Sequence, residues 1–370
     1  MECFLHIGTE KTATTTVQEF LHLNSEKLMQ QGVFFSRSVG IRNHTKLAVA
    51  AYDVTRRDEF TLGVSSESEF ICVQNKITTT LDREISEVMK INPNIKVVFS
   101  SEHIQARLTT LNEVQRLKRI LTELGFSKIT IIVYLRSQPE LAQSLFSTAL
   151  KCGNIIEEPP SPNDKYFNNA CNHKETIERF GEVFGDNNMN IRLFDKKEFV
   201  NGSILDDFSA AINIKNHNNF MFPTNKNESL SGIAVKLIYS INKVNGDGIP
   251  DLELIEYISI NSSGNKFLMD SKLYDLYEDT FRLGNEWVRK HYFPNKSTLF
   301  PLAKVKQSSA NSFCKEDIDQ VSNLLCSLWS DNKDNKKALR RYEKSFLFKI
   351  YKVAGYFEIK KIINRLRSKV

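Results

Sequence analysis

Short apolar runs recur along the first 215 residues, and each is bounded by turn or polar residues. Runs of this length cannot form a full amphipathic helix, and their bulky side chains are typical of strands buried on both faces of a sheet. The predicted strands are Phe4–Ile7, Val33–Phe35, Ile95–Ser100, Ile129–Leu135 and Asn190–Phe194.

Between these runs, apolar positions recur at the spacing of an α-helix. Glycine and proline mark several of the helix ends, since Gly32 follows the first helix, Gly125 follows another, and Pro139 opens a third. The predicted helices cover Val17–Leu28, Leu47–Ala51, Ile71–Lys90, Glu113–Leu124, a stretch from Pro139, Lys174–Phe184 and Leu205–Ile212. Repeated strand–helix order predicts a parallel, doubly wound α/β sheet. The region from Tyr239 to Trp329 is predicted to be mostly helical.

Composition places the chain among globular proteins. It has 370 residues, of which 41% are hydrophobic and 25% charged, and no apolar run approaches the roughly 18–20 residues that span a bilayer. A strand is predicted within three residues of the start, so we expect no signal peptide. The six cysteines are scattered without metal-ligand spacing. We therefore expect a cytoplasmic protein with reduced thiols.

The positive charge of the chain is concentrated in its last residues. Residues 336–370 hold twelve Lys or Arg against two Glu, a net charge of +10; because the whole chain carries +6, the rest carries −4. Apolar residues alternate with these cations, which is the pattern of an amphipathic helix on an anionic membrane surface. The alternative is a helix that packs on the main domain with a solvated basic face.

The stretch from Gly8 to Thr16 has the composition of an anion site. It joins the first predicted strand to the first helix, where unpaired N–H groups and the positive end of the helix dipole meet. Lys11 adds a full positive charge, and hydroxyl donors come from Thr12, Thr14, Thr15 and Thr16. This pattern predicts a cradle for phosphate or sulfate. It is not a Walker A loop, because Gly8 precedes Lys11 by three residues and no second glycine follows.

A second signal lies at the end of the strand Ile129–Leu135. Arg136 follows that strand directly, and Ser144 lies in the second turn of the next helix, so the two could share one ligand. A guanidinium with a hydroxyl beside it suits a phosphate monoester. Taken alone, Arg136 could equally cap a helix or pair with a nearby acid.

The sequence K-T-A-T-T-T (residues 11–16), which follows H-I-G (residues 6–8), resembles the 5′-phosphosulfate loop of sulfotransferases that use PAPS (3′-phosphoadenosine 5′-phosphosulfate). Ala13 stands where a glycine is common in that family. In that family a strand ending in Arg, followed eight residues later by Ser, binds the 3′-phosphate, and Arg136 and Ser144 match this spacing. Looser patterns from Phe184 to Phe293 resemble the bacterial carbohydrate-type members. The resemblance implies that the donor is bound by Gly8, Glu10, Lys11, Thr12, Ala13, Thr14, Thr15, Thr16, Arg136 and Ser144.

The resemblance also implies a fold and a reaction. The expected fold is a P-loop-like three-layer α/β fold with a parallel sheet, over an α/β core of residues 1–215, a helical acceptor-side region of 216–330 and a basic tail of 331–370. The expected reaction transfers a sulfuryl group from PAPS to a carbohydrate, glycolipid or small-molecule hydroxyl or amine, releases PAP (3′-phosphoadenosine 5′-phosphate) and needs no metal. Lys11 would neutralise the leaving phosphate. We expect no nucleic-acid partner, and peripheral attachment to the inner membrane face through the tail.

A hydroxyl acceptor needs a base, and the sequence offers three main candidates: His44, Glu102 and His103. Glu102 and His103 follow the strand Ile95–Ser100, and as neighbours on an extended segment they would point in opposite directions. His44 follows the second strand, where carbohydrate sulfotransferases often carry their base. His6 belongs to a buried strand and is a weaker candidate. The choice between His44 and Glu102 stays open at this point.

Two other classes of function remain as alternatives. The first is a nucleotide-dependent kinase of the P-loop type, against which the incomplete Walker A pattern counts. The second is a non-catalytic module on a membrane surface, with the basic tail as its working part. Binding of ATP with magnesium, compared with binding of PAP, would separate the kinase from the sulfotransferase.

Overall fold

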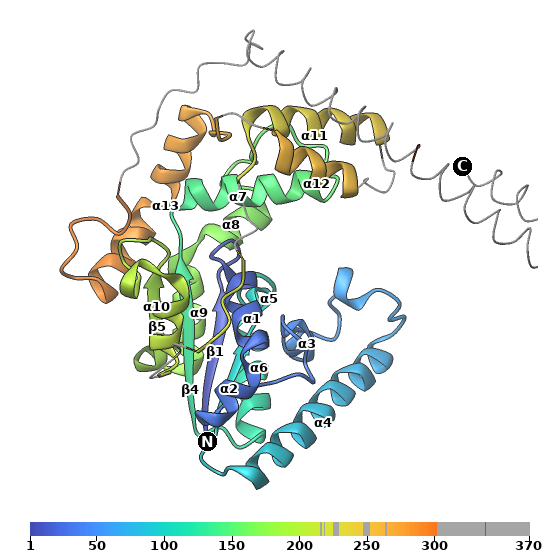
Figure 1. Cartoon of the computed structure of the whole chain (residues 1–370), viewed down its shortest axis with the longest axis vertical. Coiled ribbons are helices and arrows are strands. Elements are labelled where there is room, and N and C mark those ends of the chain that lie inside the picture. The colour runs from blue at the N-terminus through green and yellow to red at the C-terminus, as the bar shows by residue number, and fades with distance from the viewer. Residues whose placement is uncertain are drawn as a thin grey trace, which may run out of the picture. The chain divides into compact units, whose positions relative to one another are not determined.

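The protein contains a five-stranded parallel sheet with the strand order β2-β3-β1-β4-β5 (Figure 1). The computed structural model describes residues 1–214, 217, 219–224, 229–246, 252–262, 265–301 and 337. The strands are β1 (Glu2–Gly8), β2 (Val33–Phe35), β3 (Lys96–Ser100), β4 (Lys128–Leu135) and β5 (Met189–Leu193). All five strands were predicted from the apolar runs, with ends within about two residues.

The helices alternate with the strands along the chain. Those before β4 are α1 (Thr14–Leu23), α2 (Ser25–Gln30), α3 (Thr45–Ala51), α4 (Glu67–Ile91), α5 (Glu102–Arg107) and α6 (Leu111–Glu123). Those after β4 are α7 (Gln138–Lys151), α8 (Lys165–Cys171), α9 (His173–Phe184), α10 (Ile204–Ala211), α11 (Gly232–Asn245), α12 (Leu252–Asn261) and α13 (Ser271–Tyr292). Short 3₁₀ turns lie at Glu59–Thr61, Asp186–Asn188 and Val200–Gly202.

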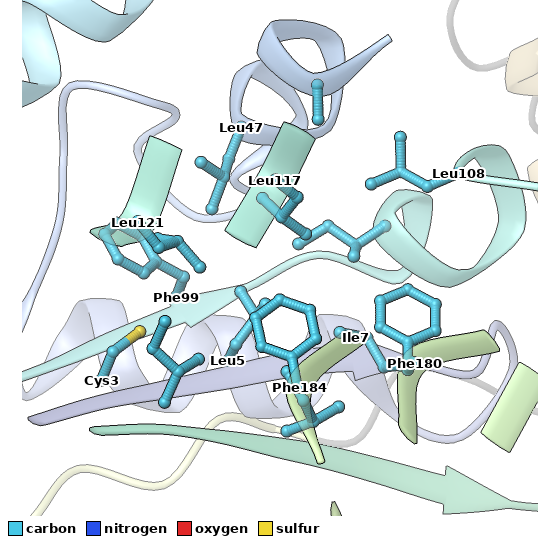
Figure 2. Close-up of a cluster of buried hydrophobic side chains, with 14 of the residues drawn as sticks. Cys3, Leu5, Ile7, Leu47, Phe99, Leu108, Leu117, Leu121, Phe180 and Phe184 are labelled. Atoms are coloured by element: carbon cyan, nitrogen blue, oxygen red, sulfur yellow. The ribbon is translucent and has the colours of Figure 1, made fainter. Parts of the chain in front are cut away.

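Two hydrophobic cores lie on opposite faces of the sheet, because neighbouring residues of a strand point to opposite sides. One core joins Leu5, Val97 and Ile131 to helices that include α3, α4, α6 and α9. Figure 2 shows part of this cluster, with Leu47, Leu117 and Phe180 packed over Leu5 and Ile7. The other core joins Phe4, Val98 and Ile132 to α1, α2 and α10. The predicted three-layer α/β fold is confirmed.

This strand order determines where chemistry can occur. β1 is the central strand and pairs with both β3 and β4, so the residues that follow these three strands meet at one edge of the sheet. The segments concerned are the Gly8–Thr16 loop, the start of α5 and the residues after Leu135. In open α/β sheets, ligands bind at the carboxyl ends of the strands.

Three details differ from the sequence prediction. The first predicted helix is two helices, because Asn24 interrupts it and its side chain binds the carbonyl oxygen of Phe20. Glu102 and His103 open a short helix, α5, so the extended segment predicted for them is wrong. Helix α8 was not predicted at all; the carboxylate of Asp164 caps its first turn by accepting from the N–H groups of Tyr166 and Phe167.

The chain divides into two compact units. Of the described residues, those up to 229 and those from 268 to 301 form the first unit, which contains the sheet. Those between 230 and 267 belong to the second unit, with α11 and α12. In the second unit, Gly232 N–H donates to the Asn265 carbonyl (3.0 Å) and Phe267 N–H to the Leu230 carbonyl (2.9 Å). The predicted basic tail of 331–370 lies outside the described residues except for Lys337. Among the described helices, none combines the length and the hydrophobicity that a membrane span requires.

Candidate functional site

The loop between β1 and α1 is fixed by its own hydrogen bonds and by β4. Both the N–H and the hydroxyl of Thr9 donate to the Tyr134 carbonyl at 3.1 Å. The hydroxyl of Thr12 donates to the Thr9 carbonyl at 2.7 Å, and Thr12 is fully buried. The loop therefore uses the Thr12 hydroxyl for its own structure, and the predicted role of that hydroxyl as a ligand donor is not favoured.

The N-terminus of α1 faces the same loop. Val17 N–H donates to the Ala13 carbonyl, so the N–H groups of Thr14, Thr15 and Thr16 precede the first bonds within the helix. Ala13 occupies the N-cap position in a left-handed conformation, with φ of 59°, and no side chain among the described residues caps this end. Unpaired N–H groups at the positive end of a helix dipole favour an anionic ligand.

Lys11 lies in the middle of the loop and carries the charge that the sequence predicted. Its ammonium group makes no hydrogen bond to another described residue and is only partly exposed. Burial lowers the pKa of Lys11 below its usual value, while the charges of Glu10 and Glu102 raise it and that of Arg136 lowers it. Glu10 itself accepts a hydrogen bond of 2.5 Å from the hydroxyl of Tyr166. An anion bound at this loop would pair with the positive charge of Lys11.

Arg136 contacts the Lys11 loop directly. Its Nη1 atom donates to the Lys11 carbonyl at 3.0 Å, and its Nε atom donates to Glu140 at 3.3 Å. The guanidinium lies over the ring of Phe194, with 5.6 Å from Cζ to the ring centroid. Within the described part of the chain, Nη2 makes no hydrogen bond and remains available to a ligand. The structure thus brings together two motifs that lie 125 residues apart.

His173 supports Arg136 and was not predicted from the sequence. Its Nε2 atom lies 2.7 Å from the Arg136 carbonyl, so this nitrogen carries the proton and donates. Burial lowers the pKa of His173 to about 4, which keeps the ring neutral near pH 7. Ser144 lies in the second turn of α7 and is partly exposed, but no hydrogen bond joins it to Arg136. A ligand shared by Ser144 and Arg136 stays a prediction.

Glu102 begins α5 next to the Lys11 loop. A Cβ atom added to Gly8 would lie 3.1 Å from the Cα atom of Glu102, so a glycine is needed where the two segments approach. The carboxylate accepts hydrogen bonds from Gln18 on α1 and from Asn43 on the loop before α3. Sequence reasoning missed both amides, because nothing in their local sequence indicates that they meet Glu102.

His103 is the neighbour of Glu102 but contacts a different group. Its ring packs edge-on against Phe60, with 4.7 Å between the ring centroids. The Nδ1 atom is enclosed and has no hydrogen-bond partner among the described residues. His103 is therefore close in sequence to the Lys11 loop, but no contact shown here connects its ring to Lys11 or to the Glu102 carboxylate.

His44 lies in the hydrophobic core, which differs from the accessible position expected for a base. Its ring is fully buried and stacks on Phe35, with 4.5 Å between centroids. Nε2 lies 2.9 Å from the Ser36 carbonyl, and Nδ1 accepts from the Ser100 N–H at 3.2 Å. Because both ring nitrogens bind backbone groups, neither is available to an acceptor hydroxyl. The geometry favours a structural role for His44.

A pocket of about 350 Å³ lies beyond the end of β5. It contains none of the site residues predicted from the sequence, although Leu193 in its wall directly precedes Phe194, which packs against Arg136. Its lining is Leu193, Asp195, Lys197, Glu198 and residues 295–301. Within the described ranges, no group of three His, Cys, Asp or Glu side chains is placed to hold a metal ion.

Comparisons with known proteins add little to this geometry. No protein-family model matches the chain, and no curated protein matches it. Among solved structures, the chain is similar to the crystal structure of a sulfotransferase from Alicyclobacillus acidocaldarius, with a TM-score of 0.37 and 11% sequence identity. The match covers 74% of this chain and 99% of that one. A likeness this distant does not establish an activity or a donor.

Proposed function

We propose that the chain is a sulfotransferase that takes its sulfuryl group from PAPS. The observation that supports this proposal most directly is the hydrogen bond from Arg136 to the Lys11 carbonyl. That bond brings two cationic side chains and the open N-terminus of α1 to one edge of the sheet. A donor with a phosphosulfate at one end and a 3′-phosphate at the other needs two separate anion sites of this kind.

The proposed donor fits the residues that form the site. The N–H groups of Thr14, Thr15 and Thr16 and the Lys11 ammonium would hold the phosphosulfate, because these donors have no partner in the described structure. The free Nη2 atom of Arg136 would bind the 3′-phosphate. Gly8, Glu10, Thr12 and Ala13 would shape the loop, with Glu10 fixed by Tyr166.

The proposed reaction depends on stabilising the charge of the leaving phosphate and on placing a base beside the acceptor. The acceptor oxygen attacks the sulfur and forms a new S–O bond, while the bond from sulfur to the phosphate oxygen breaks and its electron pair stays on PAP. Lys11 and the α1 N–H groups would stabilise the negative charge that develops there. The acceptor proton would pass to Glu102. Two observations support this choice: the backbone of Glu102 closely approaches Gly8, and the charge of Glu102 acts on Lys11.

The proposed acceptor is a hydroxyl or amine of a carbohydrate, glycolipid or small molecule, as the sequence resemblance implies. We also keep the proposal that the basic tail of 331–370 binds an anionic membrane near a lipid-linked acceptor. Its support is the alternation of cations and apolar residues in the sequence, together with the net charge of +10 over residues 336–370.

The experiment that tests this function follows radiolabelled sulfate. Purified protein is incubated with [³⁵S]PAPS alone and with an array of sugars, glycolipids and small alcohols, and release of PAP and labelled product is measured. We expect turnover in the wild type, strong loss in Lys11→Ala, and no change in Lys90→Ala, which removes an exposed lysine at the end of α4. No PAP release under any condition would contradict the proposal.

A further inference from the structure

The carboxylate of Glu102 is held by two amide side chains from separate elements. Gln18 Nε2 on α1 donates to Oε2 at 2.8 Å, and Asn43 Nδ2 donates to Oε1 at 3.0 Å. A carboxylate can only accept, so each amide must present its nitrogen to it. Each oxygen therefore receives one amide donor and keeps a further lone-pair direction for another partner.

The position of this carboxylate relative to the anion site follows from the helix. Gln18 lies four residues after Thr14, so its backbone is about 6 Å along α1 from the first helical residue. The close approach of Gly8 to Glu102 holds the start of α5 against the same loop. The charge of Glu102 also raises the pKa of Lys11, which agrees with the short separation. The Glu102 carboxylate is thus bound by a side chain that starts about one helical turn after the proposed phosphosulfate site.

Both amides are held in place by other contacts. Gln18 is 3% exposed, so packing limits its rotamers. The Oδ1 atom of Asn43 accepts from the Thr45 hydroxyl at 3.2 Å, which directs Nδ2 toward Glu102. The ring of the next residue, His44, donates a hydrogen bond to the Ser36 carbonyl and accepts one from the Ser100 N–H, which anchors the loop. The histidine therefore fixes the loop from inside the core, while Asn43 faces Glu102.

We propose that Gln18 and Asn43 are positioning residues that hold Glu102 to take the acceptor proton. This inference rests on the proposed function. The remaining lone pairs of the carboxylate accept the hydroxyl proton as the acceptor oxygen bonds to sulfur and the phosphate oxygen of PAP leaves with its electron pair. Two donors from two elements fix the carboxylate plane, and such fixed geometry is worth a large factor in rate. The amides themselves do not touch the reacting atoms.

A double-mutant cycle tests this role with water as the acceptor. The readouts are the rate of [³⁵S]PAPS hydrolysis, the KM for PAPS, and the PAP dissociation constant from calorimetry. Gln18→Leu and Asn43→Ala should each lower kcat about tenfold, and Glu102→Gln about 100-fold, with KM and PAP affinity within about twofold of wild type. Gln115→Leu, on the exposed surface of α6, is the matched control and should leave all three unchanged.

The decisive comparison is the effect of the amide variants in the Glu102→Gln background. Residues that act only through Glu102 should add less than about twofold there, because their target is already gone. Fully additive losses, or single variants with wild-type kcat, would overturn the inference while leaving the proposed function intact. A wild-type protein that neither binds PAP nor hydrolyses PAPS would overturn the proposed function and this inference with it.

Discussion

The buried position of His44 makes the stability of the fold depend on pH. Nε2 must carry the proton, because it faces the Ser36 carbonyl, and Nδ1 must be bare, because the Ser100 N–H donates to it. A second proton on Nδ1 would place two N–H groups against each other. Only the neutral ring fits this site, and burial lowers the pKa of His44 from 6.5 to about 3.

The loss of folding stability at low pH can be calculated from the difference between the pKa values of His44 in the folded and unfolded protein. Between pH 6.5 and about 3, unfolding takes up a proton at His44, because the unfolded ring is charged and the folded ring is neutral. The contribution of His44 to stability is therefore intact above pH 6.5 and is lost progressively as the pH falls. At pH 5 the loss is about 2 kcal/mol for one such histidine. His6 and His173, also buried with lowered pKa values, add to the decline.

Urea unfolding of wild type and His44→Gln at pH 7 and pH 5 isolates this contribution. The variant should be less stable at pH 7 by about 1–3 kcal/mol, since one of the two backbone groups loses its partner. Between the two pH values, however, wild type should lose about 2 kcal/mol more than the variant, because His6 and His173 contribute equally to both. If wild type and variant showed the same pH dependence of stability, His44 would not be the group held neutral in the folded protein. A folded variant that binds PAP but turns over about 100-fold more slowly would contradict the structural role of His44, because such a loss is the signature of a base.

Substitutions at two further positions test the donor site. Lys11→Ala should lower turnover by about 100-fold or more and PAP affinity by less, because its charge matters most as the bridging bond breaks; kinetics with [³⁵S]PAPS and calorimetry with PAP measure the two effects. Arg136→Ala should weaken PAP binding by about 2–4 kcal/mol, the cost of losing a charged contact to the 3′-phosphate. If wild type and Arg136→Ala bound PAP equally well, Arg136 would not make that contact. Arg136→Lys should recover part of the affinity, because it keeps the charge without the planar fork.

The sheet could be predicted from the sequence because its strands are buried on both faces. Runs such as Ile129–Leu135 have no polar face and are too short for a helix, so few other structures suit them. The sequence prediction missed helix α5, although a serine at the N-cap position (Ser101) followed by an acidic residue (Glu102) is an ordinary signal of a helix start. These residues follow β3 directly, so in the sequence they could be mistaken for a continuation of that strand.

The candidate site was only partly accessible from the sequence. Lys11 and Arg136 could be paired because each follows a strand, and strand ends of a parallel sheet meet at one edge. The role of His44 could not be predicted, because Phe35 and Phe99, which bury it, come from two different strands. The contacts of Gln18 and Asn43 with Glu102 likewise join segments up to 84 residues apart, and no local pattern reports them.

The proposed donor site requires that this edge of the sheet bind a nucleotide with two separate phosphate positions. Calorimetry of the purified wild type with PAP, with adenosine 5′-phosphate, and with ATP plus magnesium tests it most directly. We expect PAP to bind at least about 30-fold more tightly than adenosine 5′-phosphate, equivalent to roughly 2 kcal/mol from the 3′-phosphate. Equal affinity for these two nucleotides, or tighter binding of ATP with magnesium than of PAP, would contradict it.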